Sequence, residues 1–191
     1  MIPSKLLILA NVVTVETPVR PGLNSIAYIN HPDLQLTDAL VAAQKLKECK
    51  ESPAILVLSG GVGCGKSQAA AWYCVRAKGL WADAFEMMMK PQNGWSTNEE
   101  AWNEWLMEPV LVIDDFGAFP GAESTGLKIG ALLMARWNAG RVTIITTNLG
   151  MKDFASAVFG TAIERLADRL RENPIPWFQP CLNKSLRASH E

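Results

Sequence analysis

One glycine-rich stretch of the chain has the residue types and spacing of a phosphate-binding loop. The segment SGGVGCGKSQ, residues 59–68, matches the pattern G-x-x-x-x-G-K-[ST] with Gly60, Gly65, Lys66 and Ser67. A phosphate chain needs several backbone N–H groups at close approach, which Cβ atoms would obstruct. We expect Lys66 to pair with the β- and γ-phosphates and the Ser67 hydroxyl to ligate Mg²⁺. The predicted binding residues are Gly60, Gly61, Val62, Gly63, Cys64, Gly65, Lys66, Ser67 and Gln68.

Two carboxylates follow a second apolar run. The segment VLVIDDFG, residues 110–117, has the pattern of a buried strand that ends in Asp114 and Asp115. Ligands of α/β proteins bind at the carboxyl ends of such strands. We expect Asp114 to hold Mg²⁺, directly or through water, and Asp115 to polarise an attacking water molecule. Paired acids that serve only solubility are the alternative, which the wholly apolar remainder of the strand disfavours.

A third apolar run, TIITTN, ends in Asn148. A neutral amide at this position can orient a water molecule or touch the γ-phosphate without repelling it. An Asn after a strand is otherwise an ordinary turn residue. Its place in the series of phosphate loop, paired aspartates and asparagine, each after a strand, favours the functional interpretation.

The remaining pattern alternates strands with helices, which predicts a parallel sheet sandwiched by helices. The expected strands cover residues 54–60, 110–117 and 141–148. The expected helices are residues 38–50 with Thr37 as N-cap, 67–79 closed by Gly79, 96–109 with a Thr97–Glu100 capping box, 124–140, and 161–173 with a Thr161–Glu164 capping box. Residues 82–90 fit either a strand or a helix. Trp102 and Trp105 share a helix face and fit either the core or an exposed aromatic patch for a partner or for bases.

Composition excludes several classes of protein. The 191 residues are 49% hydrophobic and 19% charged, which suits a globular domain, and the net charge of −1 gives no overall attraction to nucleic acid. The segment from Gly126 onward carries 9 basic and 5 acidic residues. This excess of basic residues fits an ordinary solvated surface as well as it fits a face that binds phosphates.

The cysteines and the apolar runs bear on zinc, compartment and membranes. Four cysteines without CxxC spacing and only two histidines make a zinc site improbable, and the thiols are typical of a reduced cytoplasmic protein. No stretch approaches the roughly 18 apolar residues needed to cross a bilayer. We therefore expect a cytoplasmic protein with no membrane contact.

Taken together, the segments GGVGCGKS, LVIDDFG and TIITTNL resemble those of AAA+ ATPases, most of all the DnaC/IstB-like group of replicative helicase loaders and transposition helper ATPases. FGTAIERLADRL resembles the arginine-finger box of that group, and NKSLR its terminal Ser-x-Arg. The resemblance covers about Thr37–Arg187. It implies a P-loop NTPase of the AAA+ (ASCE) type without a distinct C-terminal lid, with an ATPase core at 36–191 and a short irregular extension at 1–35.

The resemblance also assigns roles to single residues. It implies that Asp114 is the Walker B residue, Asp115 the catalytic acid and Asn148 sensor 1. Arg165 matches the arginine finger best, with Arg169 as second candidate, and such an arginine acts across a subunit boundary. The alternative for both is a surface pairing with Glu164 and Asp168 along the helix. Arg136 matches a second interfacial arginine or closes its helix against the dipole.

The function implied is that of an ATPase that binds ATP or ADP with Mg²⁺ and assembles head to tail in the ATP state. Nonspecific single- or double-stranded DNA and a replicative helicase are the expected partners. One alternative is an IstB-like transposition helper that coats duplex DNA. The other is a nucleotide-gated binding module with negligible turnover.

Overall fold

The computed structural model describes residues 36–89, 95–117, 122–159 and 169–183. The strands are β1 (Ala54–Gly60), β2 (Leu80–Asp83), β3 (Val110–Phe116), β4 (Val142–Thr147) and β5 (Phe178–Cys181). The helices are α1 (Asp38–Cys49), α2 (Lys66–Ala77), α3 (Ala84–Met89), α4 (Trp95–Met107), α5 (Ala122–Asn138) and α6 (Met151–Phe159). The predicted extension at 1–35 lies outside the described residues.

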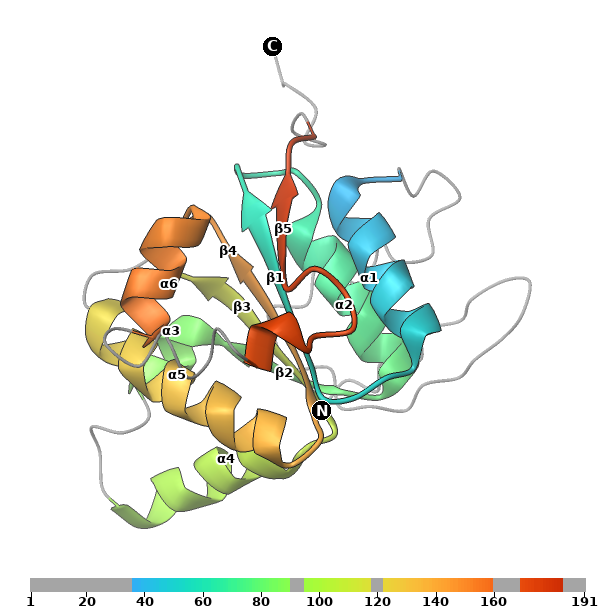
Figure 1. The fold of residues 1–191 in the computed structure, drawn as a ribbon. Coiled ribbons are helices and arrows are strands. Elements are labelled where there is room, and N and C mark those ends of the chain that lie inside the picture. Colours follow the sequence, from blue (N-terminus) through green and yellow to red (C-terminus); the bar gives the residue numbers. More distant parts are fainter. Residues whose placement is uncertain (1–35, 90–94, 118–121, 160–168, 184–191) are drawn as a thin grey trace, which may run out of the picture.

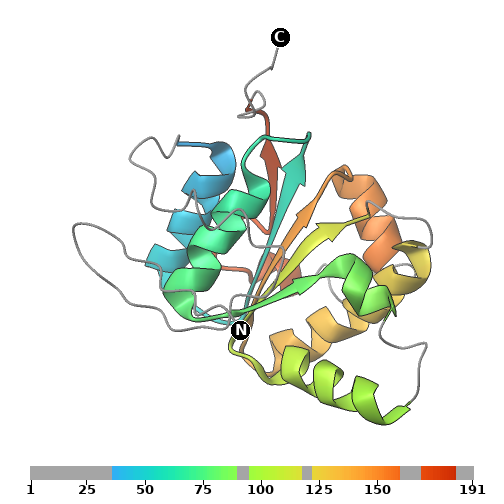
Figure 2. The ribbon, with the colours of Figure 1, turned by 180° about the vertical axis from the view of Figure 1, so that it is seen from behind.

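The five strands form one parallel sheet in the order β2-β3-β4-β1-β5, with helices on both faces (Figures 1 and 2). This confirms the predicted fold class. Strand β4 lies between β1 and β3, so its carboxyl end lies between the phosphate loop after β1 and the aspartates of β3. The sheet order therefore brings all three predicted motifs to one edge.

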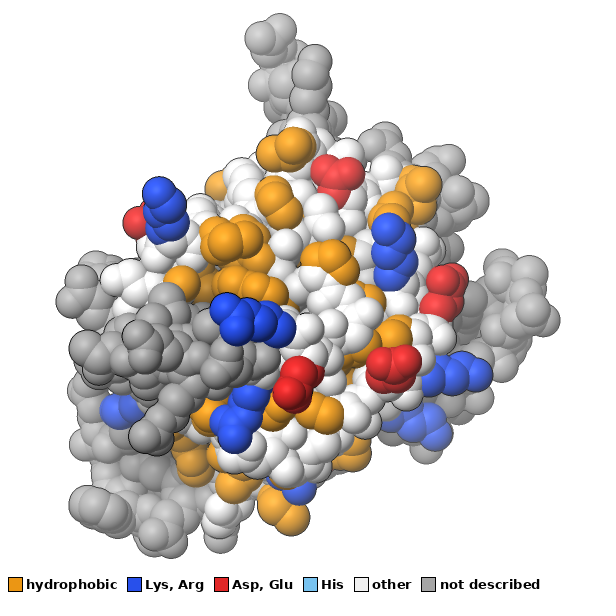
Figure 3. Space-filling view, viewed as in Figure 1, with side chains coloured by type: hydrophobic (Ala, Val, Ile, Leu, Met, Phe, Trp, Pro, Cys, Tyr) orange, Lys and Arg blue, Asp and Glu red, His pale blue; other side chains and the backbone are white. Residues whose placement is uncertain are grey.

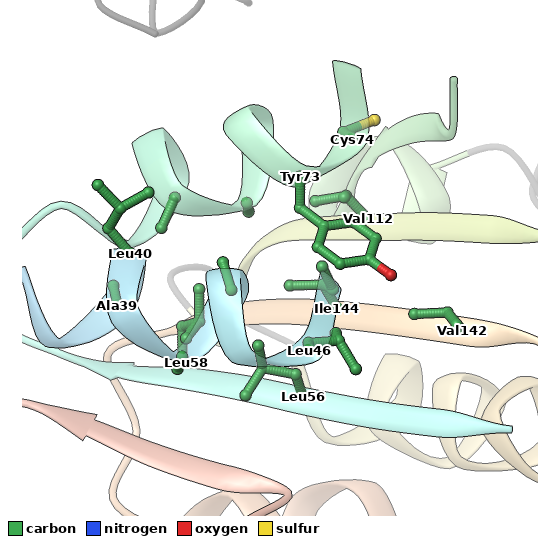
Figure 4. Close-up of a cluster of buried hydrophobic side chains, with 14 of the residues drawn as sticks. Ala39, Leu40, Leu46, Leu56, Leu58, Tyr73, Cys74, Val112, Val142 and Ile144 are labelled. Atoms are coloured by element: carbon green, nitrogen blue, oxygen red, sulfur yellow. The ribbon is translucent and has the colours of Figure 1, made fainter. Parts of the chain in front are cut away.

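Helices α1 and α2 cover one face of the sheet (Figure 4). Leu46 of α1 and Tyr73 of α2 pack in one buried cluster with Leu56 of β1 and Ile144 of β4. Because α2 begins at Lys66, this packing fixes the direction in which the phosphate loop leaves β1.

The other face of the sheet is covered by α3 to α6 (Figures 1 and 2). Trp105 of α4, Leu132 of α5 and Phe154 of α6 are buried in one cluster with Ile113 of β3 and Ile145 of β4. Apolar residues therefore face helices on both sides of the sheet, which is why β1, β3 and β4 are continuous apolar runs in the sequence.

One predicted helix boundary is confirmed, at the start of α1, and one is corrected, at the end of α2. Thr37 caps α1, because its hydroxyl accepts a hydrogen bond from the Leu40 N–H at 3.1 Å. At the end of α2, Lys78 adopts the left-handed conformation, with φ of 53°. The predicted Gly79 cap is therefore wrong by one residue, although the Gly79 N–H does donate to the Cys74 carbonyl at 2.8 Å.

The later helix boundaries differ from prediction as well. Helix α4 begins at Trp95, two residues before Thr97, so the expected capping box at Thr97 is wrong. The ambiguous residues 82–90 divide between β2 and α3, where the Asp83 carboxylate accepts from the Phe85 N–H at 2.8 Å. The predicted capping box at Thr161 lies outside the described residues, and residues 169–171 are helical.

Strand β5 was not anticipated from the sequence. Among the described residues it pairs with β1 alone, at the edge of the sheet. Pro180 is tolerated there because no described strand pairs with the other side of β5. Among the described residues after β4, only α6, the helical residues 169–171 and β5 follow, and they form no separate lid. No helix in the described part of the chain is long and apolar enough to span a membrane.

Candidate functional site

The phosphate loop, residues 60–68, connects β1 to α2 as predicted. A Cβ atom on Gly60 would lie 2.4 Å from the Cys181 carbonyl oxygen of β5, so this close approach requires glycine. Gly65 precedes α2 with φ of 93°, a conformation that side chains rarely adopt. The loop therefore meets the first turn of α2, where free N–H groups and the positive end of the helix dipole favour an anion.

Lys66 is buried, and oxygen atoms of the loop and of Asn148 surround its amine. The Nζ atom donates to the carbonyls of Gly60 at 2.7 Å and Gly61 at 2.8 Å, and to Oδ1 of Asn148 at 3.0 Å. The structure thus brings two residues that are 82 positions apart into direct contact. The amine is held at the loop by neutral acceptors, which an anionic ligand can replace.

Ser67 and Asp114 lie together, as the prediction of a shared metal ion requires. The Ser67 hydroxyl donates to Oδ1 of Asp114 at 2.9 Å, and the Thr146 hydroxyl donates to the same oxygen. Burial raises the pKa of Asp114, while these two hydrogen bonds act in the opposite direction. A hydroxyl and a carboxylate are the hard oxygen ligands that Mg²⁺ prefers, so this pair fits the ion.

Asp115 and Asn148 are exposed at the same edge of the sheet. Asp115 has φ of 58°, which is uncommon for a residue other than glycine, and its N–H donates to the Thr146 hydroxyl at 2.9 Å. The Asp115 side chain is exposed, so its carboxylate is accessible to water. Its role as the acid that activates water stays a prediction.

Several hydroxyl groups at this edge were not singled out from the sequence. The Thr147 hydroxyl donates to the Phe116 carbonyl at 2.7 Å, and the Ser59 hydroxyl donates to the Leu149 carbonyl at 2.6 Å. Together with Thr146, they tie the ends of β1, β3 and β4 to one another. The feature of the sequence that could have indicated these hydroxyls is the pair Thr146 and Thr147 at the end of β4.

Cys64 of the phosphate loop is buried against the end of β5. A Cβ on Gly60 would lie 3.1 Å from its sulfur and 3.2 Å from the Cβ of Cys181. Burial raises the pKa of Cys181 to about 12, so its thiol is neutral at physiological pH. Both side chains therefore fill space beneath the loop.

The interpretation of Arg136 as an interfacial arginine is wrong. Its side chain is fully buried, and it donates to the Thr143 hydroxyl at 2.8 Å and to the Val142 carbonyl at 2.6 Å. It also donates to the carbonyls of Trp105 and Glu108 at the end of α4. Burial, with a smaller contribution from Arg141, lowers its pKa to about 10, so Arg136 stays charged at neutral pH. It joins α4, α5 and β4 within one subunit.

We expect Arg136→Met to destabilise the fold by about 3 kcal/mol, because it leaves buried carbonyls without donors. Urea denaturation followed by circular dichroism measures this loss. Lys128→Met is the matched control, because Lys128 is exposed on the same helix. Equal stability of the two variants would contradict the structural role of Arg136.

Only one of the two arginine-finger candidates lies among the described residues. Arg165 lies outside the described residues. Arg169 is partly buried, and its Nη1 lies 3.7 Å from the sulfur of Met134 on α5. Its role at a subunit boundary therefore stays a prediction.

Trp102 and Trp105 of α4 take part in the packing of the core. Trp105 is buried in the core, and Trp102 is partly buried with its ring edge-on to that of Trp105 at a centroid distance of 5.9 Å. A base-stacking platform on this helix face is thereby disfavoured, because the Trp105 ring is enclosed.

No family model matches the chain, and no curated protein matches its sequence. Solved structures do match. The crystal structure of DnaI gives a TM-score of 0.61 at 21% sequence identity, covering 78% of this chain and 87% of the DnaI chain. The DnaC helicase loader gives 0.51 at 20% identity, covering 71% and 90%. The replication initiator DnaA, bound to AMPPCP and single-stranded DNA, gives 0.60 at 15% identity, covering 88% of this chain and 52% of its own.

The chain shares the fold of these solved structures. Its five-stranded parallel sheet is flanked by helices, and the glycine-rich loop lies between β1 and α2. The resemblance to the DnaC/IstB-like group is confirmed at the level of the fold, since DnaI and the DnaC helicase loader both match over most of their chains.

Proposed function

We propose that the chain binds and hydrolyses ATP and acts in DNA replication as a helicase-loader-like AAA+ protein. One observation carries the catalytic part: four predicted site residues converge in two contacting pairs. Lys66 contacts Asn148 at 3.0 Å, and Ser67 contacts Asp114 at 2.9 Å. A phosphate group beside Lys66 would thus lie between the loop and the ends of β3 and β4.

Each residue of the site has a role that follows from its place. Backbone N–H groups of the loop and the start of α2 bind the phosphates, and Lys66 pairs with their charge. Ser67 and Asp114 would hold Mg²⁺, which neutralises phosphate charge when bound. Asp115 accepts the proton of the attacking water, and Asn148 orients that water toward the γ-phosphate.

Assembly supplies the affinity for DNA in this proposal. In the described part of the face shown in Figure 3, acidic and basic side chains are interspersed. A single subunit with so mixed a surface binds DNA weakly, so a head-to-tail homo-oligomer formed with ATP would bind through many weak contacts. The likeness to DnaI, to the DnaC helicase loader and to the replication initiator DnaA supports a role in replication rather than transposition.

We expect Asp115→Asn to lower ATP turnover about 10²-fold while nucleotide affinity stays within about threefold, because the amide keeps the size but loses the basicity. Asn tolerates the left-handed backbone as well as Asp does, so the fold is retained. Steady-state phosphate release and equilibrium binding measure the two effects. Asp153→Asn, an exposed acid on α6, is the control. Parental turnover in Asp115→Asn would remove this residue from the mechanism.

The same variant serves to test the partner, because it holds ATP without consuming it. Tagged Asp115→Asn protein, loaded with ATP or ADP, is mixed with purified replicative helicase or with purified transposase from the same source. Capture of the helicase with ATP alone supports loading. Capture of the transposase instead indicates the transposition helper, and negligible wild-type turnover with saturating DNA indicates a nucleotide-gated binding module.

A further inference from the structure

The ladder between β3 and β4 contains a bulge at the two aspartates. Ile113 pairs with Ile145, and the next pair is Phe116 with Thr147. Two residues of β3, Asp114 and Asp115, therefore lie opposite one residue of β4. A bulge of this kind re-aims the side chains around it and is common beside active sites.

The residue opposite the bulge is Thr146, which is 1% exposed. Its hydroxyl donates to Oδ1 of Asp114 and accepts from the N–H of Asp115 at 2.9 Å. One hydroxyl can do both, because it has one donor and two acceptor sites. The bulge displaces the Asp115 N–H from the regular ladder, and the Thr146 side chain takes the place of the missing carbonyl.

These two bonds fix the backbone at Asp115 and the position of one oxygen of Asp114. The bond to the Asp115 N–H supports a backbone with φ of 58°, a conformation unfavourable for a residue with a Cβ. The bond to Asp114 holds its Oδ1 beside the Ser67 hydroxyl. Without the bulge, successive carboxylates would simply alternate between the faces of the sheet.

We propose that Thr146 is a positioning residue that couples the metal-binding carboxylate of Asp114 to the water-activating carboxylate of Asp115 through its single hydroxyl. This inference rests on the proposed function of the site. It assigns a role to a residue for which the motif resemblance provides none. The neighbouring Thr147 differs, because its hydroxyl contacts the Phe116 carbonyl and the Leu149 N–H rather than either acid.

The test compares three full-length variants. Thr146→Val removes the hydroxyl and keeps the shape, whereas Thr146→Ser keeps the hydroxyl. Thr143→Val removes another buried hydroxyl of β4, one that accepts from Arg136 far from the acids. Binding of a fluorescent ADP analogue is measured across a magnesium titration and in EDTA, and ATP turnover is measured in parallel.

We expect two changes in Thr146→Val, since one hydrogen bond to a charged group is lost. The magnesium concentration that gives half of the maximal effect on binding of the ADP analogue rises about tenfold, and kcat falls about tenfold or more. Affinity in EDTA stays within about twofold, because the phosphate loop is untouched. Thr146→Ser restores both values, and Thr143→Val leaves both unchanged even where it lowers thermal stability. If the valine variant does not fold, Thr146→Ala removes the same hydroxyl with less bulk.

Three results would overturn the role of Thr146. The first is a wild-type magnesium dependence and a wild-type kcat in the variants without the hydroxyl. The second is a Thr146→Ser variant that is as impaired as Thr146→Val. The third is an equal rise in the magnesium concentration required and an equal fall in kcat in Thr143→Val. A wild-type protein without magnesium-dependent nucleotide binding would instead overturn the proposed function, and this inference with it.

Discussion

We expect Lys66→Ala to lower the affinity for ATP about 10³-fold. In the structure, neutral oxygens of Gly60, Gly61 and Asn148 already hold the amine at the loop, so phosphate binding costs little reorientation. Each hydrogen bond to a charged group is worth about 1.5–3 kcal/mol, and Lys66 would provide one each to the β- and γ-phosphates. The loss of both corresponds to about three orders of magnitude in Kd.

Isothermal titration with ATP and Mg²⁺ measures this loss. Lys45→Ala, which removes an exposed lysine from α1, is the control for net charge. Thermal melting without nucleotide should change little, because water can replace the lost amine. Gly61 and Asn148 are exposed, and Gly60 is partly exposed. ATP affinity in Lys66→Ala equal to that of the control would show that this loop does not bind phosphates.

The sequence was most informative where a local pattern and a buried element coincide. Strands β1, β3 and β4 are mostly apolar because helices cover both faces of the sheet, and each run ends in polar residues at the site. Parallel strands end at one edge, so strand direction alone placed the loop, the aspartates and Asn148 at the same edge of the sheet. The direct contact of Lys66 with Asn148 also depends on the pairing of β4 with β1, which the sequence did not predict. That is why the loop, the aspartates and the asparagine could be predicted to meet.

Features that depend on distant partners were missed or misjudged. Strand β5 has only four residues, two of them Gln179 and Pro180, and only its pairing with β1 defines it. Arg136 has the position of a residue that caps a helix or faces a partner. Two of its acceptors, the carbonyls of Trp105 in α4 and of Glu108 just after it, are 31 and 28 residues away in the sequence. No local pattern reveals them.

The bulge at Asp114 and Asp115 is a further case of this kind. The run VLVIDDF reads as a regular strand, and the sequence carries no glycine at the residue with positive φ. The extra residue becomes visible only in the register with β4. Thr146 therefore gains its importance from the pairing of two strands and not from its own motif.

The end of the predicted arginine helix is anchored far from the phosphate loop of the same subunit. The Asn173 side chain accepts from the Ile55 N–H at 2.8 Å and donates to the Ile55 carbonyl at 3.0 Å. Ile55 precedes Gly60 by five residues, or about 16 Å along β1. The helical residues 169–171 accordingly lie toward the start of β1 (Figure 1). Arg165 itself lies outside the described residues, so its action on a neighbouring subunit stays a prediction.

Arg165→Ala should lower ATP turnover about 10³-fold and leave ATP affinity within about threefold, because an arginine finger stabilises charge that develops in the transition state. Arg169→Ala, tested in parallel, shows which arginine carries the effect. Arg171→Ala is the control, because this residue is exposed at the end of the same helix.

Mixing two inactive variants tests whether the site is shared between subunits. Arg165→Ala retains the phosphate loop, and Lys66→Ala retains the arginine. An interface that takes the loop from the first and the arginine from the second is intact. In an equal mixture, roughly a quarter of the interfaces of a head-to-tail assembly combine the two in this way, so turnover should rise toward that fraction of the wild-type value. Turnover in the mixture that stays at the level of the separate variants, at concentrations where the wild type assembles, would exclude an arginine acting across the subunit boundary.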